Sequence, residues 1–377
     1  MVSLRAAPAE ARGRKRTRLR EMTIIRKHLT ALGLGTLALL AAGPALVGPA
    51  RAEPPRIAVV ATGGTIAMKL DPTTHAPVPA LSGEDLVAAV PKLKDIATIE
   101  VTEFSNVPSD YMGPDRWPAL SQRIDALLAD PGIRGAIVLH GTDTLDQTAY
   151  FLDLTLKSDK PVVLVGAQRN ASDVDADGPR NLLNAARQIL ADGAVGQGVT
   201  VTLNHRINAA REVRKTHTSN VETFNSGDAG ILGYVDEDRV VFGRRSLRRQ
   251  TLPLPERMPR VDLVAMYAGA DGSQVRHAAG SGAEAIVVEA YGWGNVNAEM
   301  HDAIAEAVAK GVPVIVATKV YDGRALPVYG FKGGGSTLRK AGAVFAGDLT
   351  PDKARILTLI ALSAGKDQAS LQRVFDK

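Results

Sequence analysis

The feature that most constrains the fold of this chain is a regular alternation, from residue 56 onward, of short apolar runs with longer amphipathic segments. The short runs are rich in β-branched residues, as buried strands of a parallel sheet are. We expect strands at residues 56–61, 99–104, 135–140, 161–165 and 199–203, and helices at residues 84–90, 114–130, 144–156 and 178–190. The alternation predicts βαβ units around a mainly parallel sheet flanked by helices, which is an α/β fold.

A second α/β pattern follows a segment of different composition. Residues 244–260 read RRSLRRQTLPLPERMPR, with three prolines, six arginines and no apolar periodicity, which is typical of an exposed linker between domains. Beyond it we expect strands at residues 261–266, 285–290 and 314–317, and helices at residues 297–310 and 351–363. The chain therefore divides into a large N-terminal domain, residues 53–243, and a smaller C-terminal α/β domain, residues 261–377.

The basic charge of the chain is concentrated at its start. Residues 1–52 hold ten Lys and Arg and two Asp and Glu, whereas the remainder holds 35 basic and 38 acidic residues. The remainder also has few aromatic residues and no recognition motif for nucleic acid, so we do not expect nucleic-acid binding.

The same 52 residues have the pattern of a secretory signal peptide. Arg26 and Lys27 precede an apolar run at residues 29–47, and Ala50-Arg51-Ala52 is a small-x-small cleavage site before Glu53. A transmembrane anchor is the alternative, but glycines and prolines interrupt the run, which is short for a hydrocarbon layer of roughly 30 Å. Met22 is an alternative start codon, because the Arg-rich residues 1–21 fit a signal poorly, and both general and twin-arginine export are left open.

Export predicts a periplasmic or secreted protein without a membrane anchor after cleavage. The chain has no cysteine, so it forms no disulfide, and a thiolate metal site or a cysteine nucleophile is excluded. Its seven histidines show no metal-ligand spacing, and we expect neither a metal nor a cofactor. His140 is expected to pack at a strand end.

Two glycine turns carry the candidate chemistry. Residues 59–67 read VVATGGTIA, a strand followed by adjacent glycines that place Thr65 at the carboxyl edge of the sheet, where such sheets bind ligands. Residues 137–144 read IVLHGTDT and repeat this arrangement with Thr142 and Asp143. Alone, the first turn could be structural or bind phosphate, and the second could be a helix N-cap. Together they put two hydroxyls and a carboxylate at one edge.

These two segments resemble the signature segments of bacterial L-asparaginases. Similar matches follow in order at residues 149–155, 160–167, 176–182 and 353–355, so the resemblance covers nearly everything after the leader. It implies an amidohydrolase that acts on a linear amide without a cofactor, in which Thr65 forms an acyl-enzyme with L-asparagine. Glutaminase-asparaginase is the alternative within this class, because one methylene separates the two substrates.

The resemblance also implies the roles of other residues. Thr142, Asp143 and Lys215 correspond to a supporting triad, although Lys215 read by itself is equally consistent with a surface charge. Residues implied to bind substrate are Gly64, Ser109, Asp110, Gly141, Ala167 and Asn295. Asn295 matches a residue that the family supplies from a neighbouring subunit, so a homo-oligomer, commonly a tetramer, is expected.

The sequence departs from the family pattern at two places. Residues 68–82, MKLDPTTHAPVPALS, contain no tyrosine where the family places one that activates the nucleophile. Either another tyrosine such as Tyr111 reaches in, or the loop works differently, or turnover is weak. Residues 324–339 lack the glutamate that the family donates across subunits. A catalytically weak extracytoplasmic amino-acid-binding protein is therefore the alternative from another class.

Overall fold

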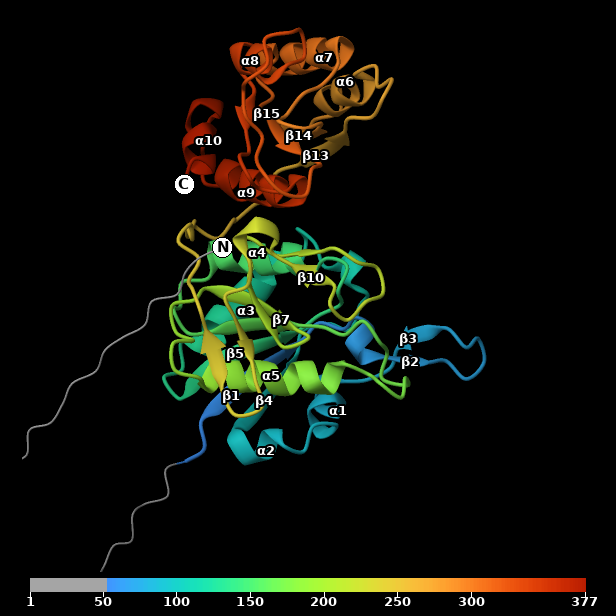
Figure 1. The fold of residues 1–377 in the computed structure, drawn as a ribbon, viewed down its shortest axis with the longest axis vertical. Helices are drawn as coiled ribbons and strands as arrows, with labels where there is room; N and C mark the ends of the chain where they lie inside the picture. The colour runs from blue at the N-terminus through green and yellow to red at the C-terminus, as the bar shows by residue number, and fades with distance from the viewer. Residues whose placement is uncertain (1–52) are drawn as a thin grey trace, which may run out of the picture. The chain divides into compact units, whose positions relative to one another are not determined.

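The computed structural model describes residues 53–377, and the predicted signal peptide lies outside the described residues. The N-terminal domain is built on one sheet in the order β12-β11-β8-β7-β6-β5-β1-β4 (Figure 1). Its strands are β1 (Arg56–Ala61), β4 (Thr98–Glu103), β5 (Ile133–Leu139), β6 (Val162–Val165), β7 (Val199–Leu203), β8 (Arg206–Ala209), β11 (Gly233–Val235) and β12 (Val240–Phe242). The five strands from β4 to β7 are parallel, and β8, β11 and β12 extend the sheet in antiparallel fashion.

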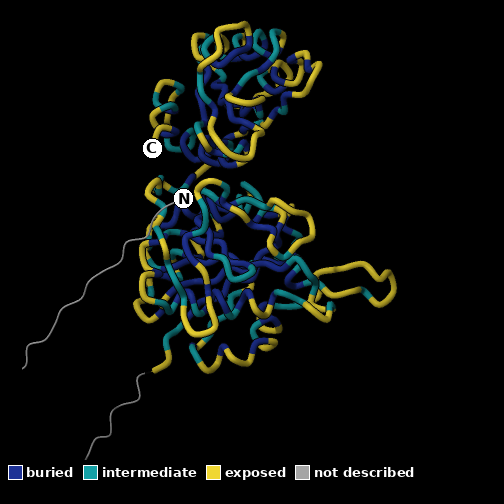
Figure 2. Tube along the Cα trace, in the orientation of Figure 1, coloured by how far each residue is buried: buried dark blue, intermediate teal, exposed yellow. Residues whose placement is uncertain are grey.

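Alternating side chains of the central strands build a core on each face of this sheet. Ala58 and Val60 of β1 belong to a cluster with α3 and α4, whereas Ile57 and Val59 belong to a cluster with α1, α2 and α5. The helices are α1 (Gly83–Ala88), α2 (Leu93–Ile96), α3 (Trp117–Leu128), α4 (Leu145–Thr155) and α5 (Gly178–Leu190). Figure 2 shows the buried strands in the interior of the domain. Burial on both faces explains why these strands are continuous apolar runs.

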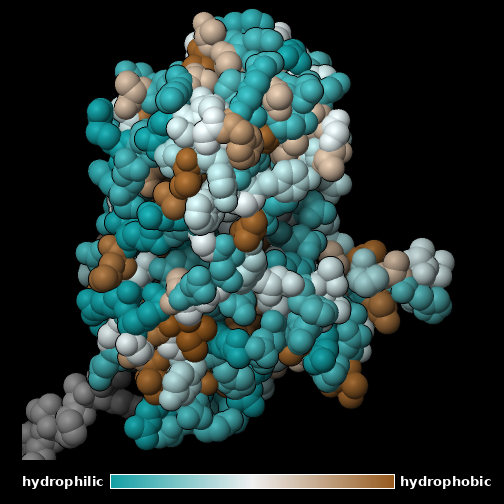
Figure 3. Space-filling view, turned by 45° about the horizontal axis from the view of Figure 1, so that its top comes forward, coloured by the Kyte–Doolittle hydropathy of each residue, from teal (hydrophilic) through white to brown (hydrophobic). Residues whose placement is uncertain are grey.

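Short elements decorate the carboxyl edge of the sheet and its surroundings. They are the 3-10 turns η1 (Thr65–Ala67), η2 (Ser109–Tyr111) and η3 (Gly227–Ala229) and the strand pairs β2 (Met68–Leu70) with β3 (Pro77–Pro79) and β9 (Arg214–Lys215) with β10 (Phe224–Asn225). The β2/β3 hairpin projects from the domain and is largely exposed (Figures 1 and 2). Apolar side chains show on this projection in Figure 3. The predicted loop after the first glycine turn is therefore a hairpin.

The C-terminal domain has a four-stranded parallel sheet, β13-β14-β15-β16. Its strands are β13 (Val261–Ala265), β14 (Ala285–Ala290), β15 (Val314–Thr318) and β16 (Val344–Phe345), and its helices are α6 (Ser273–Gly280), α7 (Ala298–Ala309), α8 (Gly335–Lys340), α9 (Pro351–Ser363) and α10 (Gln368–Phe375). The helices α6 and α7 share a core with one face of the sheet, and α9 shares the core cluster that also contains α4. One apolar core thus spans the two domains.

Residues 244–260 contain neither helix nor strand. Leu252, Leu254 and Met258 nevertheless pack against the shared core, and the Leu252 amide donates to the Leu154 carbonyl at 3.0 Å or less. This segment is consequently fastened along the molecule rather than fully exposed. Among residues 53–377, no helix has both the length and the apolar composition to cross a bilayer.

Candidate active site

The first glycine turn is shaped by a close approach of two backbones. Gly64 has φ +87°, and a Cβ built on it would lie 2.1 Å from the Cα of Gly141. Gly63 has φ +103°, and its Cβ would lie 2.5 Å from the Val107 amide nitrogen. Only glycine fits both requirements at these positions. The turn that ends β1 is therefore pressed against the turn that ends β5, and Thr65, partly exposed, follows it at the start of η1.

The second turn is fixed by His140, which is fully buried at the end of β5. Its Nδ1 lies 2.7 Å from the Gly141 carbonyl oxygen, and its Nε2 lies 3.0 Å from the Thr148 hydroxyl. Burial lowers the pKa of His140 to about 4, so the ring is neutral at pH 7. The predicted packing role of His140 is confirmed, and it orients the peptide that precedes Thr142.

The N-cap interpretation of Thr142 and Asp143 is wrong. The helix α4 takes Thr144 as its N-cap residue, and that side chain makes no capping hydrogen bond. The Thr144 hydroxyl instead donates to the Ser109 carbonyl oxygen at 2.6 Å, and the Asp143 amide donates to the Ser109 hydroxyl at 3.2 Å. Ser109 is buried, so η2 is tied firmly to the second turn. Its neighbour Asp110 is exposed.

Lys215 enters the site from β9. Its Nζ donates to the Thr142 hydroxyl at 2.8 Å and to the Asp143 carboxylate at 2.7 Å. The Lys215 side chain is only 18% exposed, whereas that of Asp143 is 64% exposed. The surface-charge interpretation of Lys215 is therefore wrong, and the structure brings together a hydroxyl, an ammonium and a carboxylate that lie 72 or more positions apart only in pairs along the chain.

Gln168 was not predicted from the sequence, yet it contacts this group directly. The Thr142 hydroxyl donates to the Gln168 Oε1 at 2.9 Å, and the Gln168 amide side chain donates to the Thr218 carbonyl at 3.2 Å. The Asp177 carboxylate holds the Gln168 amide nitrogen at 3.1 Å, next to the buried Ala167. The position of Gln168 directly after Ala167 was the only signal available in the sequence.

Asn295 lies in the other domain of the chain. Its carbonyl and amide pair with Tyr291, and its side chain accepts from the Gly335 amide at 3.4 Å. Within residues 53–377, the hydrogen bonds of Asn295 thus stay inside the C-terminal domain. Tyr111, the candidate replacement for the absent loop tyrosine, has a 61% exposed side chain.

The arrangement is suited to nucleophilic chemistry on a small polar molecule. A threonine hydroxyl needs an adjacent base to become a nucleophile, and a lysine amine at hydrogen-bonding distance is one of the groups that can serve. Glycine turns leave main-chain N–H groups free to face a developing negative charge. An exposed carboxylate and a buried hydroxyl in the same place complement a molecule with both an ammonium and a carboxylate.

Comparison with known proteins agrees with this geometry. The family described as Asparaginase, N-terminal matches residues 56–248, and the Glutaminase/Asparaginase C-terminal domain matches residues 260–375. The protein named L-asparaginase 2 from Escherichia coli (strain K12) is 35% identical over 331 residues, covering 86% of this chain and 93% of its own. A probable periplasmic L-asparaginase from Haemophilus influenzae is 36% identical, with the same coverage.

A solved structure is similar over the same region. The crystal structure of a probable cytoplasmic L-asparaginase from Campylobacter jejuni has a TM-score of 0.78 and 36% identity, and the match covers 85% of this chain and 99% of that one. Both domains of the described structure, with the site between the two glycine turns, thus have counterparts in proteins of one family. The chain belongs to the asparaginase family.

Proposed function

We propose that this protein is an L-asparaginase that hydrolyses L-asparagine to L-aspartate and ammonia. The observation that carries the proposal is the contact of the Lys215 Nζ with both the Thr142 hydroxyl and the Asp143 carboxylate. It lies beside the glycine turn that presents Thr65. A threonine hydroxyl next to a lysine–threonine pair has the parts required for acyl transfer.

The reaction proceeds in two steps. The Thr65 oxygen attacks the side-chain amide carbon, its proton goes to the leaving nitrogen through the Thr142–Lys215 pair, and ammonia departs. Water then attacks the resulting ester and releases L-aspartate and the free Thr65 hydroxyl. Main-chain N–H groups at the turns of Gly64 and Gly141 stabilise the oxyanion of each step.

Substrate recognition is assigned to the groups around Ser109. The Ser109 hydroxyl binds the α-carboxylate, and Asp110 with Asp143 binds the α-ammonium. The main chain at Ala167 faces the amide that is cleaved. Ser109 is buried and already fixed by Thr144, which supports a preorganised binding role.

The test is ammonia release from L-asparagine by protein that begins at Glu53. We expect release by the unchanged protein and by Thr98→Ala, a matched control on the exposed first residue of β4, and none by Thr65→Ala. Equal rates for Thr65→Ala and the control would exclude Thr65 as the nucleophile. No release by the unchanged, folded protein would favour the amino-acid-binding alternative, which tight binding of L-asparagine without turnover would establish.

The same assay with L-glutamine measures the breadth of specificity. The pocket must sense one methylene, which is worth about 1–3 kcal/mol. A ratio of kcat/KM for the two amides above about 100 identifies an asparaginase, and a ratio near one identifies a glutaminase-asparaginase.

We also propose that the protein is a periplasmic or secreted enzyme of the type II group. The Arg26-Lys27 pair, the apolar run and the Ala50-Arg51-Ala52 site of the sequence support export. Sequencing of the exported protein should find an N-terminus at Glu53. Retention of the full chain in the cytoplasm would refute this assignment.

A homo-oligomer, expected as a tetramer, completes the proposal. Trp293, Tyr329 and Phe331 form an aromatic patch with ring centroids 5.7 Å apart and exposures of 47%, 45% and 53%. The Trp293 carbonyl accepts from the Leu326 amide at 2.7 Å, so the patch is joined to the turn that carries Asn295. Exposed clustered aromatics are typical of protein interfaces, and a second copy that covers this patch would receive Asn295 at its own site.

A further inference from the structure

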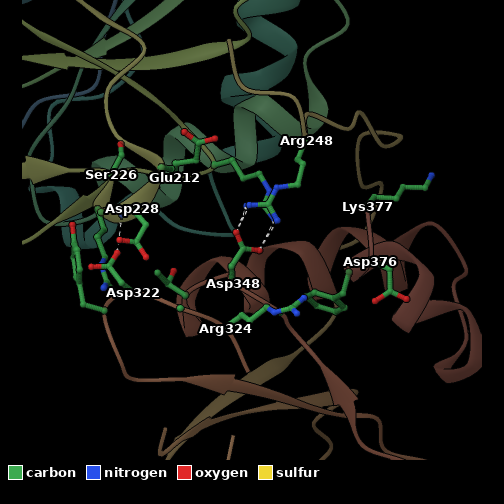
Figure 4. Close-up of a pocket in the computed structure, with 18 residues that line it drawn as sticks. Glu212, Ser226, Asp228, Arg248, Asp322, Arg324, Asp348, Asp376 and Lys377 are labelled. Atoms are coloured by element: carbon green, nitrogen blue, oxygen red, sulfur yellow. Dashed lines mark hydrogen bonds and ion pairs between the residues drawn. The ribbon is translucent and has the colours of Figure 1, made fainter. Parts of the chain in front are cut away.

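The segment that leads to Lys215 is held chiefly by polar contacts. Residues 211–215, here called the Lys215 strap, line one side of a cavity of about 620 Å³, and Tyr321 and Asp348 of the C-terminal domain line the other. Figure 4 shows this cavity with Asp348 directed across it toward Arg248. Because the cavity leaves the strap without apolar packing on that side, its position depends on the groups that reach it.

The first such group is Asp348. Its carboxylate accepts from the Arg211 Nη1 and Nη2 at 3.0 Å each and also pairs with Arg248. Burial opposes ionisation of Asp348, but its hydrogen bonds to the two arginines outweigh burial and hold its pKa well below the usual range. A bidentate pair of this kind fixes both position and orientation, so the start of the strap is anchored to the C-terminal domain.

The second group is Lys353 of α9, which is 1% exposed. Its Nζ donates to the Arg211 carbonyl oxygen at 3.1 Å and to the Val213 carbonyl oxygen. Burial lowers the pKa of Lys353 to about 8, against the opposing effect of the nearby Asp146 carboxylate. Asp146 itself accepts from the Lys215 main-chain amide at 3.4 Å. Lys353 and Asp146 therefore hold the strap from its carbonyl and amide sides.

The third contact is made by Arg214, the residue directly before Lys215. Its guanidinium lies 3.3 Å from the ring centroid of Tyr321. This cation–π contact again joins the strap to the C-terminal domain of the same chain. Three successive points of the strap thus depend on one domain, while the Lys215 ammonium acts in the other.

We propose that Lys353 is a positioning residue for Lys215, through which the C-terminal domain keeps the lysine of its own chain aligned with Thr142 and Asp143. The inference rests on the proposed function of Lys215. A misplacement of about 1 Å in a reacting group lowers a rate by roughly 100-fold, and the Lys215 ammonium has two partners to satisfy at once. The role acts within one chain and is separate from any residue supplied by a second copy.

The test compares Lys353→Met with Lys160→Met. Methionine keeps the length of the buried stem and removes the ammonium. Lys160 is the matched control, because its Nζ also donates to two main-chain carbonyls, those of Leu128 and Asp130, away from the strap. We expect Lys353→Met to lower kcat by about 10- to 100-fold with KM changed by less than about twofold, and Lys160→Met to leave both constants near their original values.

A double-mutant cycle separates positioning from general damage. In a Lys215→Met background, adding Lys353→Met should lower the residual rate no further, since the group that it positions is gone. An equal proportional loss in both backgrounds, or no loss in either, would overturn the proposal.

Hydrogen exchange gives a readout that needs no activity. Lys353→Met should speed amide exchange in peptides that cover residues 211–217 and leave peptides of β1 unchanged; unchanged exchange in the strap would refute the proposal. If the unchanged protein releases no ammonia, the proposed function fails while this measurement still decides whether Lys353 holds the strap. Should Lys353→Met not fold, Tyr321→Leu is expected to produce the same local increase in exchange, and its absence would count against the proposal.

Discussion

The Lys215 ammonium is the single group on which the proposed chemistry depends most directly. Lys215→Met removes the donor that lies 2.8 Å from the Thr142 hydroxyl and 2.7 Å from the Asp143 carboxylate. We expect kcat/KM for L-asparagine to fall by about 10²- to 10⁴-fold, the range for loss of a positioned acid or base. Ammonia release at pH 7 checks this, with the exposed Lys157→Met as the control. Turnover within threefold of the unchanged protein would remove Lys215 from the mechanism.

Gly64 carries a prediction about backbone geometry. Gly64→Ala places a Cβ 2.1 Å from the Gly141 Cα at φ +87°, so the two turns must separate. Backbone strain of this kind costs about 1–3 kcal/mol, and we expect a lower Tm together with nearly complete loss of ammonia release. Gly280→Ala, with open space around its Cβ at the end of α6, is the control and should retain both properties. An active, equally stable Gly64→Ala protein would contradict the close approach of the two turns.

At the scale of elements, the junction of β5 and α4 should make stability depend on acid. The folded protein keeps His140 neutral because burial lowers its pKa from 6.5 to about 4. Between these values the unfolded chain binds a proton that the folded chain does not, so the stabilising contribution of a neutral His140 is complete above pH 6.5 and is lost as pH falls to 4. The total is about 3 kcal/mol.

His140→Gln measures this contribution. The difference in free energy of unfolding between the unchanged protein and the variant, from urea titrations, should shrink by about 3 kcal/mol between pH 7 and pH 4. The Trp117 indole, which donates to the Thr148 hydroxyl at 2.9 Å, provides a fluorescence signal inside the same network. A difference that is constant with pH would show that His140 titrates alike in both states.

Elements with strong local signals were predicted well. The strands β1, β7 and β14 and the helices α5 and α9 have the predicted bounds, because buried apolar runs mark the strands and a proline in the first turn marks each helix. The helix α3 begins at Trp117 rather than at residue 114, since residues 113–117 form a separate turn closed by the Gly113 carbonyl.

The antiparallel extension of the sheet was missed for a specific reason. The turn between β7 and β8 is made by Asn204 and His205, with φ of 46° and 64°, where a glycine normally signals such a hairpin. The short strands β11 and β12 and the β2/β3 hairpin were missed as well, because three residues show no periodicity. Pairing with a neighbour decides their structure.

The whole molecule sets the limit of what sequence could predict about the site. Thr65, Thr142 and Asp143 follow strand ends, so a parallel sheet alone places them at one edge. Lys215 follows no strand of the parallel sheet, and family resemblance alone indicated its role. Gln168 and the Lys353 contact depend on distant segments, the latter 140 or more residues apart, and no local pattern encodes them.

The assembly expected for this molecule can be tested by mixing inactive chains. If Asn295 serves the site of a neighbouring copy, Thr65→Ala and Asn295→Ala chains are each inactive alone, but a mixed dimer has one site with Thr65 and Asn295 both intact. Random exchange makes half of the dimers mixed, so activity should recover to about a quarter of the original. If Asn295 serves only its own chain, no mixed site is complete and no activity returns. Phe331→Glu, which charges the aromatic patch, should abolish the recovery and reduce the mass measured by light scattering, because a buried unpaired carboxylate opposes association.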